Sequence, residues 1–333
     1  MVTSHDVARE AGVSQTTVSR VLNGSEKVHP ETRARVMAAF SALSYAPNAS
    51  AQAMRTRRAG SIGVVASDMT NPFFPELLDA LSRETHRHGF KMILWNQDDD
   101  DASESVIEGV SRGLVDGVCV ASAASGVTDL SPLNRLSVPL VFVNRGMSGY
   151  AADQVTSDNA GAARMAAEYL YAAGRRRIAA VFGPKNINTG PEREEAFLAY
   201  LQSKGLRVPP EWTYRGASAF RTGYDAVEHL LRAPELPDTI FCNSDLIAFG
   251  AINALRSRGV RVPEEVWIMG IDGLPMSGWE VFDLTTVSQP IELMAREAID
   301  LLIGRIQGST AEPATLHLPT TLVVRGSTAN TTI

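Results

Sequence analysis

The chain has 333 residues, of which 44% are hydrophobic and 20% are charged, values typical of a globular protein with two or three domains. The N-terminus lacks the basic, apolar and small-residue regions of a signal peptide, and no apolar run is long enough to cross a membrane, so a cytoplasmic protein is expected. The two cysteines, Cys119 and Cys242, lie inside apolar runs and are expected to be buried thiols, which excludes a disulfide framework.

The net charge of −6 conceals a difference between the two ends of the chain. Residues 1–58 contain eight Lys or Arg and four Asp or Glu, whereas the remainder contains 23 and 33. A head of charge +4 on a body of charge −10 is typical of a protein that contacts phosphate groups at one end only. The charge pattern therefore predicts nucleic-acid binding by the head.

The segment 3–24 has the pattern of a helix–turn–helix. Thr3 and Ser4 can cap a first helix that runs to about residue 11. Gly12 supplies the unusual backbone of a tight turn, and Ser14 can cap a second helix that runs to about residue 22. A plain helical hairpin would have the same local pattern, so this segment alone does not establish DNA binding.

The expected second helix has one apolar and one polar face. Its apolar stripe is made by Val18, Val21 and Leu22, which follow the i, i+3, i+4 spacing. Short or forked polar groups lie off this stripe, toward the helix end that reaches base edges in DNA-binding motifs of this kind: Gln15, Thr16, Ser19 and Arg20.

A third helix is expected from Pro30, which suits a first helical turn. Its inward stripe is predicted to be Val36, Met37, Phe40 and Leu43. The alanine-rich residues 48–56 favour helix but are too few to form a stable isolated one, so ordering on contact with a partner is expected. Arg55, Arg57 and Arg58 would then lie near the phosphate groups of DNA; a solvated linker is the alternative interpretation.

From residue 61 onward, apolar strand-like runs alternate with helical runs. The strands are expected at 61–67, 91–96, 115–121, 139–144, 176–182, 238–244, 265–272 and 320–326, with a late amphipathic helix at 289–306. Strands buried on both faces and alternating with helices indicate a doubly wound parallel sheet. Because the series restarts after residue 158, two similar lobes are predicted.

Ligands of open α/β sheets bind beyond the carboxyl ends of the strands. In this chain those ends carry polar and aromatic side chains: Ser67, Asp68, Asn71, Phe73, Phe74, Asn144, Arg145, Asn243, Ser244, Asp245 and Asp272. Carboxylates and amides bind hydroxyl groups, and aromatic rings cover the C–H face of a sugar. The sequence therefore predicts a hinged cleft for a polyhydroxy ligand.

Motifs for nucleotide, cofactor or hydrolytic chemistry are absent from the sequence. It contains no G-x-G-x-x-G after a strand, no G-x-x-x-x-G-K-[ST], no G-x-S-x-G and no H-E-x-x-H. His86 and His88 would point in different directions on a helix, and the acidic run 98–101 is expected to be a solvated loop. No cofactor, metal ion or enzymatic activity is expected.

The motifs taken in order resemble the lactose-repressor/galactose-repressor (LacI/GalR) family. They are DVAREAGVSQTTVSRVLNG, ETRARV, LSYAPNA, IGVVASDMTNPFF, SDNAGAARMAAEYL, FCNSDLIAFGAINALR, VPEEVWIMGIDG, LTTVSQP and LVVRGST, and they cover nearly the whole chain. The resemblance implies an all-α helix–turn–helix head, a hinge helix, and an α/β core of two doubly wound parallel-sheet lobes similar to those of periplasmic sugar-binding proteins.

By position, the resemblance assigns DNA contacts within the head. Gln15 and Thr16 match the main base-reading positions of the family, and Arg20 matches another DNA-contacting position. The predicted surface also contains Thr3, Ser14, Thr17, Ser19 and Asn23. Ser4 stands where the family usually has an aliphatic residue, so a looser cap of the first helix is expected.

Residues 48–56 match the hinge helix that enters the minor groove, and the predicted contacts there are Asn48, Ala51 and Met54. Met54 stands where the family usually wedges a leucine into the central base step. Methionine is flexible and apolar, so it can still insert between bases.

Five residues match the effector-contacting positions of the family: Phe73, Asn144, Arg193, Asp245 and Asp272. Arg193 and Asp272 are the firmest, because hydroxyl-rich ligands usually meet an arginine and an aspartate there. Ser218 replaces a common aromatic platform and Ser244 a common asparagine, so the kind of sugar is open. Trp279 is either a displaced aromatic of the cleft or an exposed loop residue.

The predicted organisation is a DNA-binding domain at 1–46, a hinge at 47–58 and a core at 59–333. Within the core, one lobe is expected from about 60–157 and 288–318, and the other from about 158–287 and 319–333. The predicted function is a transcriptional regulator, and the resemblance implies a repressor of carbohydrate genes. It is expected to bind a pseudo-palindromic double-stranded DNA operator as a homodimer. A small sugar-like effector is expected to change this binding. The alternative is a sugar-capture protein without a role in gene regulation.

Overall fold

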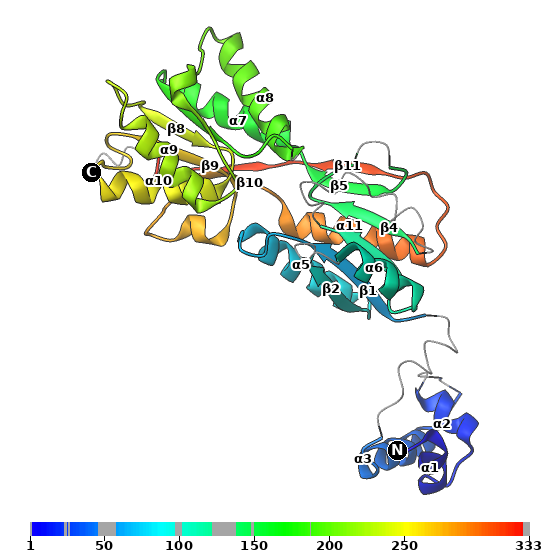
Figure 1. Cartoon of the computed structure of the whole chain (residues 1–333). Helices are drawn as coiled ribbons and strands as arrows, with labels where there is room; N and C mark the ends of the chain where they lie inside the picture. The colour runs from blue at the N-terminus through cyan, green and yellow to red at the C-terminus, as the bar shows by residue number, and fades with distance from the viewer. Residues whose placement is uncertain are drawn as a thin grey trace. The chain divides into compact units, whose positions relative to one another are not determined.

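The computed structural model describes residues 2–22, 25, 27–45, 58–96, 102–121, 138–147, 150–186 and 188–328. Contacts divide the chain into two compact units, Met1–Ala59 and Gly60–Ile333, each with its own core (Figure 1). The expected hinge helix, with Asn48, Ala51 and Met54, lies outside the described residues, as do Asn23 and the acidic run 98–101.

The described residues of the first unit form three helices: α1 (Ser4–Glu10), α2 (Gln15–Leu22) and α3 (Pro30–Ala42). Its core is formed by small and branched apolar side chains from all three helices, including Val7, Val18, Val21, Val36 and Ala39. The prediction that Met37 faces this core is wrong, because its side chain is 53% exposed. Ala39 is buried instead, so the buried face of α3 is rotated about the helix axis relative to the predicted stripe.

The ends of α1 and α2 follow the capping chemistry of their sequences. Thr3 is the N-cap of α1 in a capping box with Asp6, so the hydroxyl of Ser4 is not the cap. Gly12 has a φ of 64° in the turn, a conformation that glycine adopts without strain. Ser14 Oγ accepts a hydrogen bond from the backbone N of Thr17 at the start of α2.

The second unit is built on two six-stranded sheets. The first sheet has the order β11-β5-β4-β3-β1-β2, and all its neighbouring strands are parallel. Its strands are β1 (Ser61–Ala66), β2 (Lys91–Asn96), β3 (Gly117–Val120), β4 (Leu140–Val143), β5 (Asp153–Ser157) and β11 (Thr315–Leu318).

The second sheet has the order β12-β10-β9-β8-β6-β7. Its strands are β6 (Ile178–Phe182), β7 (Thr213–Arg215), β8 (Thr239–Cys242), β9 (Trp267–Asp272), β10 (Thr285–Ser288) and β12 (Thr321–Val323). Among the described strands of this sheet, only the pairing of β10 with β12 is antiparallel. The two parallel-dominated lobes confirm the predicted fold class.

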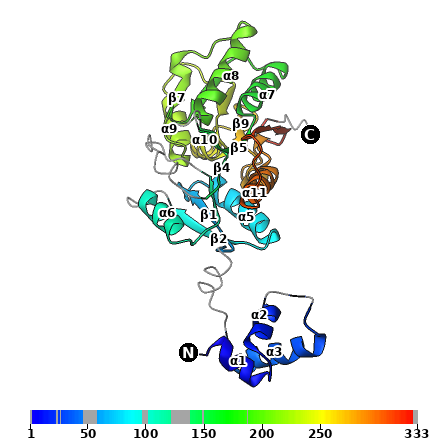
Figure 2. The same ribbon diagram turned by 90° about the vertical axis from the view of Figure 1, so that its right-hand side faces the viewer.

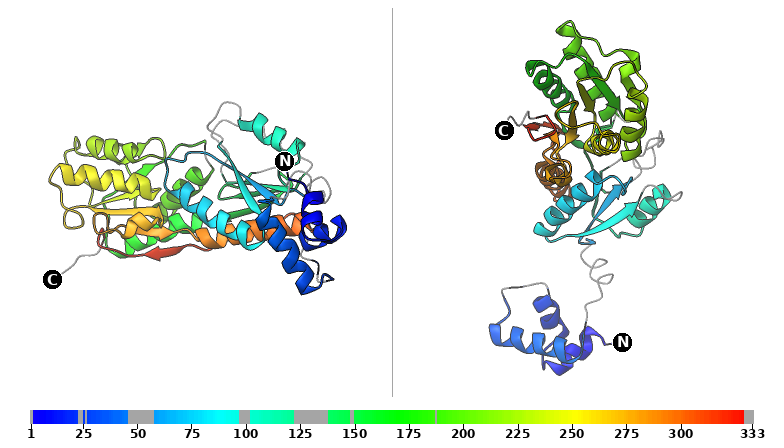
Figure 3. Two further views of the ribbon diagram at one scale, coloured as in Figure 1. Left: turned by 90° about the horizontal axis from the view of Figure 1, so that it is seen from below. Right: turned by 90° about the vertical axis from the view of Figure 1, so that its left-hand side faces the viewer.

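Helices cover both faces of each sheet. In the first lobe, α5 (Phe73–Arg87) and α11 (Ile291–Ile306) lie together on one face and α6 (Ala102–Ser111) on the other (Figure 2). In the second lobe, α7 (Asn159–Ala172) packs against α8 (Thr189–Ser203) on one face of the sheet. On the other face, α9 (Phe220–Leu230) packs against α10 (Asp245–Ser257). Figure 3 shows α11, in orange, alongside α5, in cyan.

Between residues 150 and 328 the chain passes from one sheet to the other three times, after β5, after β10 and after β11. Each lobe is therefore assembled from separate stretches of chain.

No helix in the described part of the chain is long and apolar enough to span a membrane.

The strand predictions fail in two respects. Four short strands, β5, β7, β10 and β11, were not expected, and β2 is a half-exposed edge strand, not one buried on both faces.

Cys119 and Cys242 are buried free thiols, as expected, and burial raises the pKa of Cys119 to about 12.

Candidate DNA-reading surface and effector cleft

The exposed side of α2 carries the side chains predicted to read bases. Gln15, Thr16 and Arg20 are exposed, whereas Val18 and Val21 are buried beneath them. The helix thus presents a polar row at its outer face and is anchored by its apolar face. This is the arrangement that a helix needs in order to enter a major groove.

Several residues of the predicted surface also hold the local backbone. Thr3 Oγ1 donates to Asp6 Oδ2 over 2.7 Å, and the hydroxyls of Ser14 and Thr17 lie 2.9 Å apart. Gln15 Nε2 donates a hydrogen bond of 2.9 Å to Ser4 Oγ, which joins the first residue of α2 to the first residue of α1. No local pattern in the sequence indicates this contact.

A cleft with about 520 Å³ of empty space, partly open to solvent, lies between the lobes at the carboxyl ends of their strands. The first lobe contributes Asn71, Phe73, Phe74, Asn144 and Arg145, and the second contributes Arg193, Ser218, Asn243, Ser244 and Asp272 among others. Four of the five predicted effector residues therefore line the same cleft.

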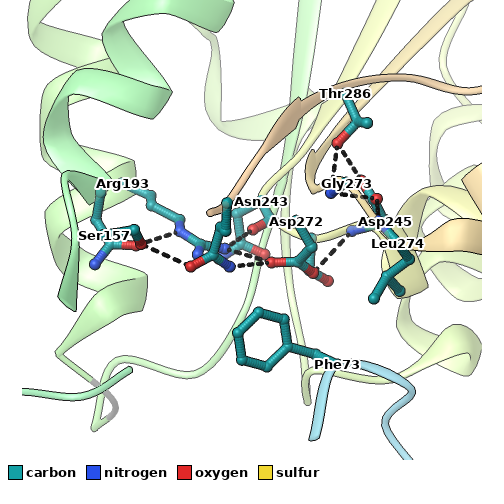
Figure 4. A network of polar contacts seen from close by, with 12 residues as sticks. Phe73, Ser157, Arg193, Asn243, Asp245, Asp272, Gly273, Leu274 and Thr286 are labelled. Atoms are coloured by element: carbon teal, nitrogen blue, oxygen red, sulfur yellow. Dashed lines mark hydrogen bonds and ion pairs between the residues drawn. The ribbon is translucent and has the colours of Figure 1, made fainter. Parts of the chain in front are cut away.

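Arg193 and Asp272 form a buried pair in the cleft wall (Figure 4). The Arg193 side chain, on α8, lies 3.3 Å from Asp272 Oδ1 and is held by bonds of 2.8 Å to Asn159 Oδ1 and to the carbonyl oxygen of Asn243. With the residue only 6% exposed, its guanidinium is fixed in place before any ligand arrives.

Asp272 ends β9, and both its side chain and its backbone are constrained. Gln289 Nε2 donates to its Oδ1 over 2.7 Å, and its φ of 150° lies in a region that favours glycine. Burial raises the pKa of this carboxyl to about 7, although Arg193 acts in the opposite direction. Asn144 also has a positive φ, 71°, and such backbone strain concentrates at functional sites.

Asp245 does not line the cleft, contrary to prediction. It is fully buried at the start of α10, where its carboxylate turns away from the cleft toward the β9–β10 region. It accepts hydrogen bonds from Ser277 Oγ (2.6 Å), Thr286 Oγ1 (2.5 Å) and the backbone N of Gly273 and Leu274 (both 2.9 Å). Asp245 therefore holds the backbone that follows Asp272.

The two predicted departures at the cleft, Ser218 and Ser244, differ in outcome from Trp279. Ser218 and Ser244 both line it, so no aromatic ring stands at 218, whereas Trp279 is 54% exposed and does not line the cleft. The aromatic rings of the lining, Phe73 and Phe74, both come from the first lobe.

Three further lining residues were not among the predicted effector contacts. Gln289 joins the lobes, because Ser157 Oγ donates to its Oε1 over 2.6 Å while its amide donates to Asp272. Asn243 is buried, and its Oδ1 has no hydrogen-bond partner in the described part of the protein. Burial lowers the pKa of Arg145 to about 10, and its guanidinium lies 5.5 Å from the centre of the Phe74 ring. Arg145 and Asn243 were visible as polar residues at strand ends, whereas Gln289 had no such signal.

No group of three or more His, Cys, Asp or Glu side chains suited to a metal ion occurs in the described ranges of the chain. The polar side chains of the cleft lining and of the exposed side of α2 include amides, hydroxyls, Arg20, Arg145 and the buried Arg193–Asp272 pair. These groups are suited to binding through hydrogen bonds.

Known proteins share both units of this chain. Residues 3–48 match the family model "Bacterial regulatory proteins, lacI family", and residues 59–325 match "Periplasmic binding proteins and sugar binding domain of LacI family". The chain is 32% identical over 329 residues to the "HTH-type transcriptional repressor PurR" of Pasteurella multocida (strain Pm70), covering 98% of both chains.

Solved structures agree with these matches. The structure titled "transcriptional regulator CelR-cellobiose complex" is 33% identical, with a TM-score of 0.75 over 98% of this chain and 100% of that one. The lac repressor dimer bound to operator and the anti-inducer ONPF is 25% identical, with a TM-score of 0.84 over 98% and 99%. The chain therefore belongs to the LacI family of bacterial regulatory proteins and is a ligand-responsive, DNA-binding regulator of transcription.

Proposed function

We propose that the protein is a cytoplasmic repressor that binds a pseudo-palindromic operator as a homodimer, and that a small hydroxyl-rich effector in the cleft changes its operator affinity. The observation that carries this proposal is the buried Arg193–Asp272 pair, which lies in a cleft lined by both lobes. A ligand held there interacts with each lobe and therefore favours one lobe arrangement over others.

The chemistry of the cleft supports a ligand with several hydroxyl groups. Asp272 offers a carboxylate, Arg193 and Asn144 offer donors, and Asn243 Oδ1 needs a donor that a ligand hydroxyl can supply. Phe73 can cover an apolar ring face from one side (Figure 4). Ser218 adds a small hydroxyl side chain to the second lobe's part of the lining, which can hydrogen-bond to a ligand hydroxyl.

Hydrogen bonds between the cleft and the lobe crossings support a change in lobe geometry on binding. Gln289 follows β10 at one lobe crossing and hydrogen-bonds to Ser157 at another, while it also donates to Asp272. A ligand that competes for the hydrogen bonds of Asp272 also changes the bonding of Gln289. The effect on DNA follows by linkage. A ligand that favours the lobe arrangement of the operator-bound protein raises operator affinity, and a ligand that favours another arrangement lowers it.

We further propose that base reading is performed by Gln15, Thr16 and Arg20, with supporting contacts from Thr3, Ser14, Thr17, Ser19 and Asn23. Residues 47–58 are the proposed hinge, with minor-groove contacts from Asn48, Ala51 and Met54. Two heads related by a two-fold axis require half-sites that are also related by two-fold symmetry.

The test begins with selection of genomic fragments by the purified full-length protein at moderate salt, followed by sequencing. A recovered pseudo-palindrome supports a regulator that binds its operator as a homodimer. Binding that is salt-sensitive and independent of sequence would favour the alternative of a sugar-capture protein. The recovered operator is then titrated in the presence of cellobiose, other neutral sugars, sugar acids, sugar phosphates and nucleobases.

A matched pair of variants assigns the response to the cleft. Asp272→Ala is expected to abolish the change in operator affinity caused by the active compound while leaving operator binding itself intact. The control is Glu104→Ala, which removes an exposed carboxylate of α6 that does not line the cleft. A normal response in Asp272→Ala would remove Asp272 from the effector site.

A further inference from the structure

One hydrogen bond in the head joins a predicted base-reading side chain to another element. Gln15 Nε2, at the start of α2, donates to Ser4 Oγ, at the start of α1, over 2.9 Å. The two residues are eleven positions apart, so the bond fixes the exposed Gln15 side chain against a neighbouring helix. By contrast, Thr16 has a short hydroxyl side chain with few rotamers to fix.

The orientation of a glutamine amide decides which base it can read. Its carboxamide has two donor hydrogens on Nε2 and an acceptor, Oε1. In the orientation seen here, Ser4 Oγ accepts one hydrogen of Nε2, and the other hydrogen and Oε1 stay available. A flipped amide would accept from the Ser4 hydroxyl instead and leave both hydrogens available. One donor beside one acceptor matches the major-groove edge of adenine, which offers N7 as acceptor and the N6 amino group as donor. Guanine presents two acceptors there, O6 and N7, and would require the amide to offer two donors.

We propose that Ser4 is a positioning residue that holds the Gln15 carboxamide in place with Nε2 toward Ser4 Oγ, and that the amide held in this orientation reads an adenine in each operator half-site. The inference rests on the proposed function, because it concerns how the head recognises an operator. Ser4 sets the selectivity of Gln15 without touching a base.

The local structure leaves Ser4 free for this role. The cap of α1 is supplied by Thr3, whose hydroxyl and backbone N both bond to Asp6. The hydroxyl of Ser4 is therefore not needed to begin the helix. Alanine at this position keeps the cap and has a higher helix propensity than serine, so Ser4→Ala is expected to fold normally.

The experiment measures base selectivity with the full-length protein. The operator is first obtained by selection from a randomised DNA library, and affinities are then measured for operators that carry each of the four base pairs at each half-site position. Gln15→Ala identifies the base pair that Gln15 reads, which is expected to contain adenine, by a loss of ~5- to 150-fold in selectivity at that position.

Ser4→Ala is expected to lower selectivity at the same position by ~2- to 12-fold, the range of one neutral hydrogen bond. The freed amide can then rotate and accept other bases without losing a protein contact. The double variant Ser4→Ala/Gln15→Ala is expected to be no less selective than Gln15→Ala alone, because Ser4 acts through Gln15. Ser4→Thr retains a hydroxyl and is expected to restore selectivity, and Thr16→Ala, as a control, changes a different position.

Three results would overturn the inference. One is an unchanged base preference in Ser4→Ala, and another is equal weakening on all operators, which would show that Ser4 contacts phosphate. The third is a preference for guanine at the position assigned to Gln15. Absence of any sequence-selective binding by the unchanged protein is a different result, because it would contradict the proposed function itself.

Discussion

The reading surface of the head and the effector cleft of the core handle polar side chains in opposite ways. In the head, Gln15 and Arg20 are exposed, and Gln15 is held by one hydrogen bond. In the cleft, Arg193 and Asp272 are buried and tied to several partners. Each exposed side chain of the head can therefore replace its bound water with a base contact without affecting its neighbours. In the cleft, the polar side chains form one connected hydrogen-bond network.

This difference predicts how mutations behave. Removing an exposed reader leaves its neighbours intact, so the effect appears in recognition and not in folding. Removing a member of a buried network leaves donors or acceptors without partners, so stability and function change together.

The largest effect is expected for Asp245→Ala. It removes four hydrogen bonds from a fully buried carboxylate and leaves Ser277, Thr286 and two backbone N–H groups without that acceptor. The free energy of unfolding of the core is expected to fall by ~3 kcal/mol or more. Urea denaturation followed by circular dichroism measures this change. A loss below ~1 kcal/mol would contradict the structural role assigned to Asp245.

Arg20→Ala gives the corresponding test in the head. Because Arg20 is exposed, the variant is expected to unfold at the same urea concentration as the unchanged protein. Its discrimination between operator and mismatched sites is expected to fall by ~1–3 kcal/mol. Competition binding at fixed salt measures the change, and equal weakening on every sequence would show that Arg20 contacts phosphate only.

A smaller effect is expected in the pH dependence of the stability of the core. The pKa of Asp272 in the folded core is about 7, above its ordinary value of 3.8, so the folded state holds a proton that the unfolded state has lost. Stability from this group is therefore present at low pH and is lost as pH rises through 7. Between pH 6 and 8 the loss is expected to be ~1–2 kcal/mol.

The check is the urea midpoint of the core at several pH values, compared with that of Asp272→Asn, which cannot titrate at this position. The unchanged protein should lose stability relative to the variant as pH rises. Parallel pH profiles would show that the carboxyl of Asp272 is already ionised throughout this range.

The smallest effect is expected for Thr3→Ala. It removes the N-cap hydroxyl of α1 and leaves the backbone N of Asp6 without its side-chain acceptor. A cost of ~1 kcal/mol in the stability of the head is expected, with no effect on the core. Hydrogen exchange of the α1 amides measures it, and Thr3→Ser is the matched control. Unchanged exchange in α1 would mean that the capping box does not stabilise the head.

The sequence was most informative where periodicity and capping chemistry act locally. Both helices of the predicted reading motif follow from capping residues and the Gly12 turn, and the buried positions Val18 and Val21 follow from apolar spacing. The short strands were missed because they are half polar: β10 (Thr285–Ser288) contains buried threonines whose hydroxyls are satisfied by other elements. Such partners are distant in sequence, so no local pattern shows them.

The cleft shows the same limit. Its parts could be placed at strand ends from the sequence, and the resemblance selected Phe73, Asn144, Arg193 and Asp272, all of which line it. Neither source showed that the carboxylate of Asp245 turns inward, because that depends on donors supplied by Ser277 and Thr286. The bond between Ser4 and Gln15 was hidden for the same reason.

The repeated crossing between sheets has a consequence for synthesis of the protein. The edge strands β11 and β12, which complete the first and second sheets, are among the last parts of the described chain to leave the ribosome. The head is synthesised first and has its own core. Domains fold in the order in which they emerge. Each new molecule therefore acquires its means of reading DNA before the apparatus that controls it, and a chain that stops before β11 carries a head without a finished control unit.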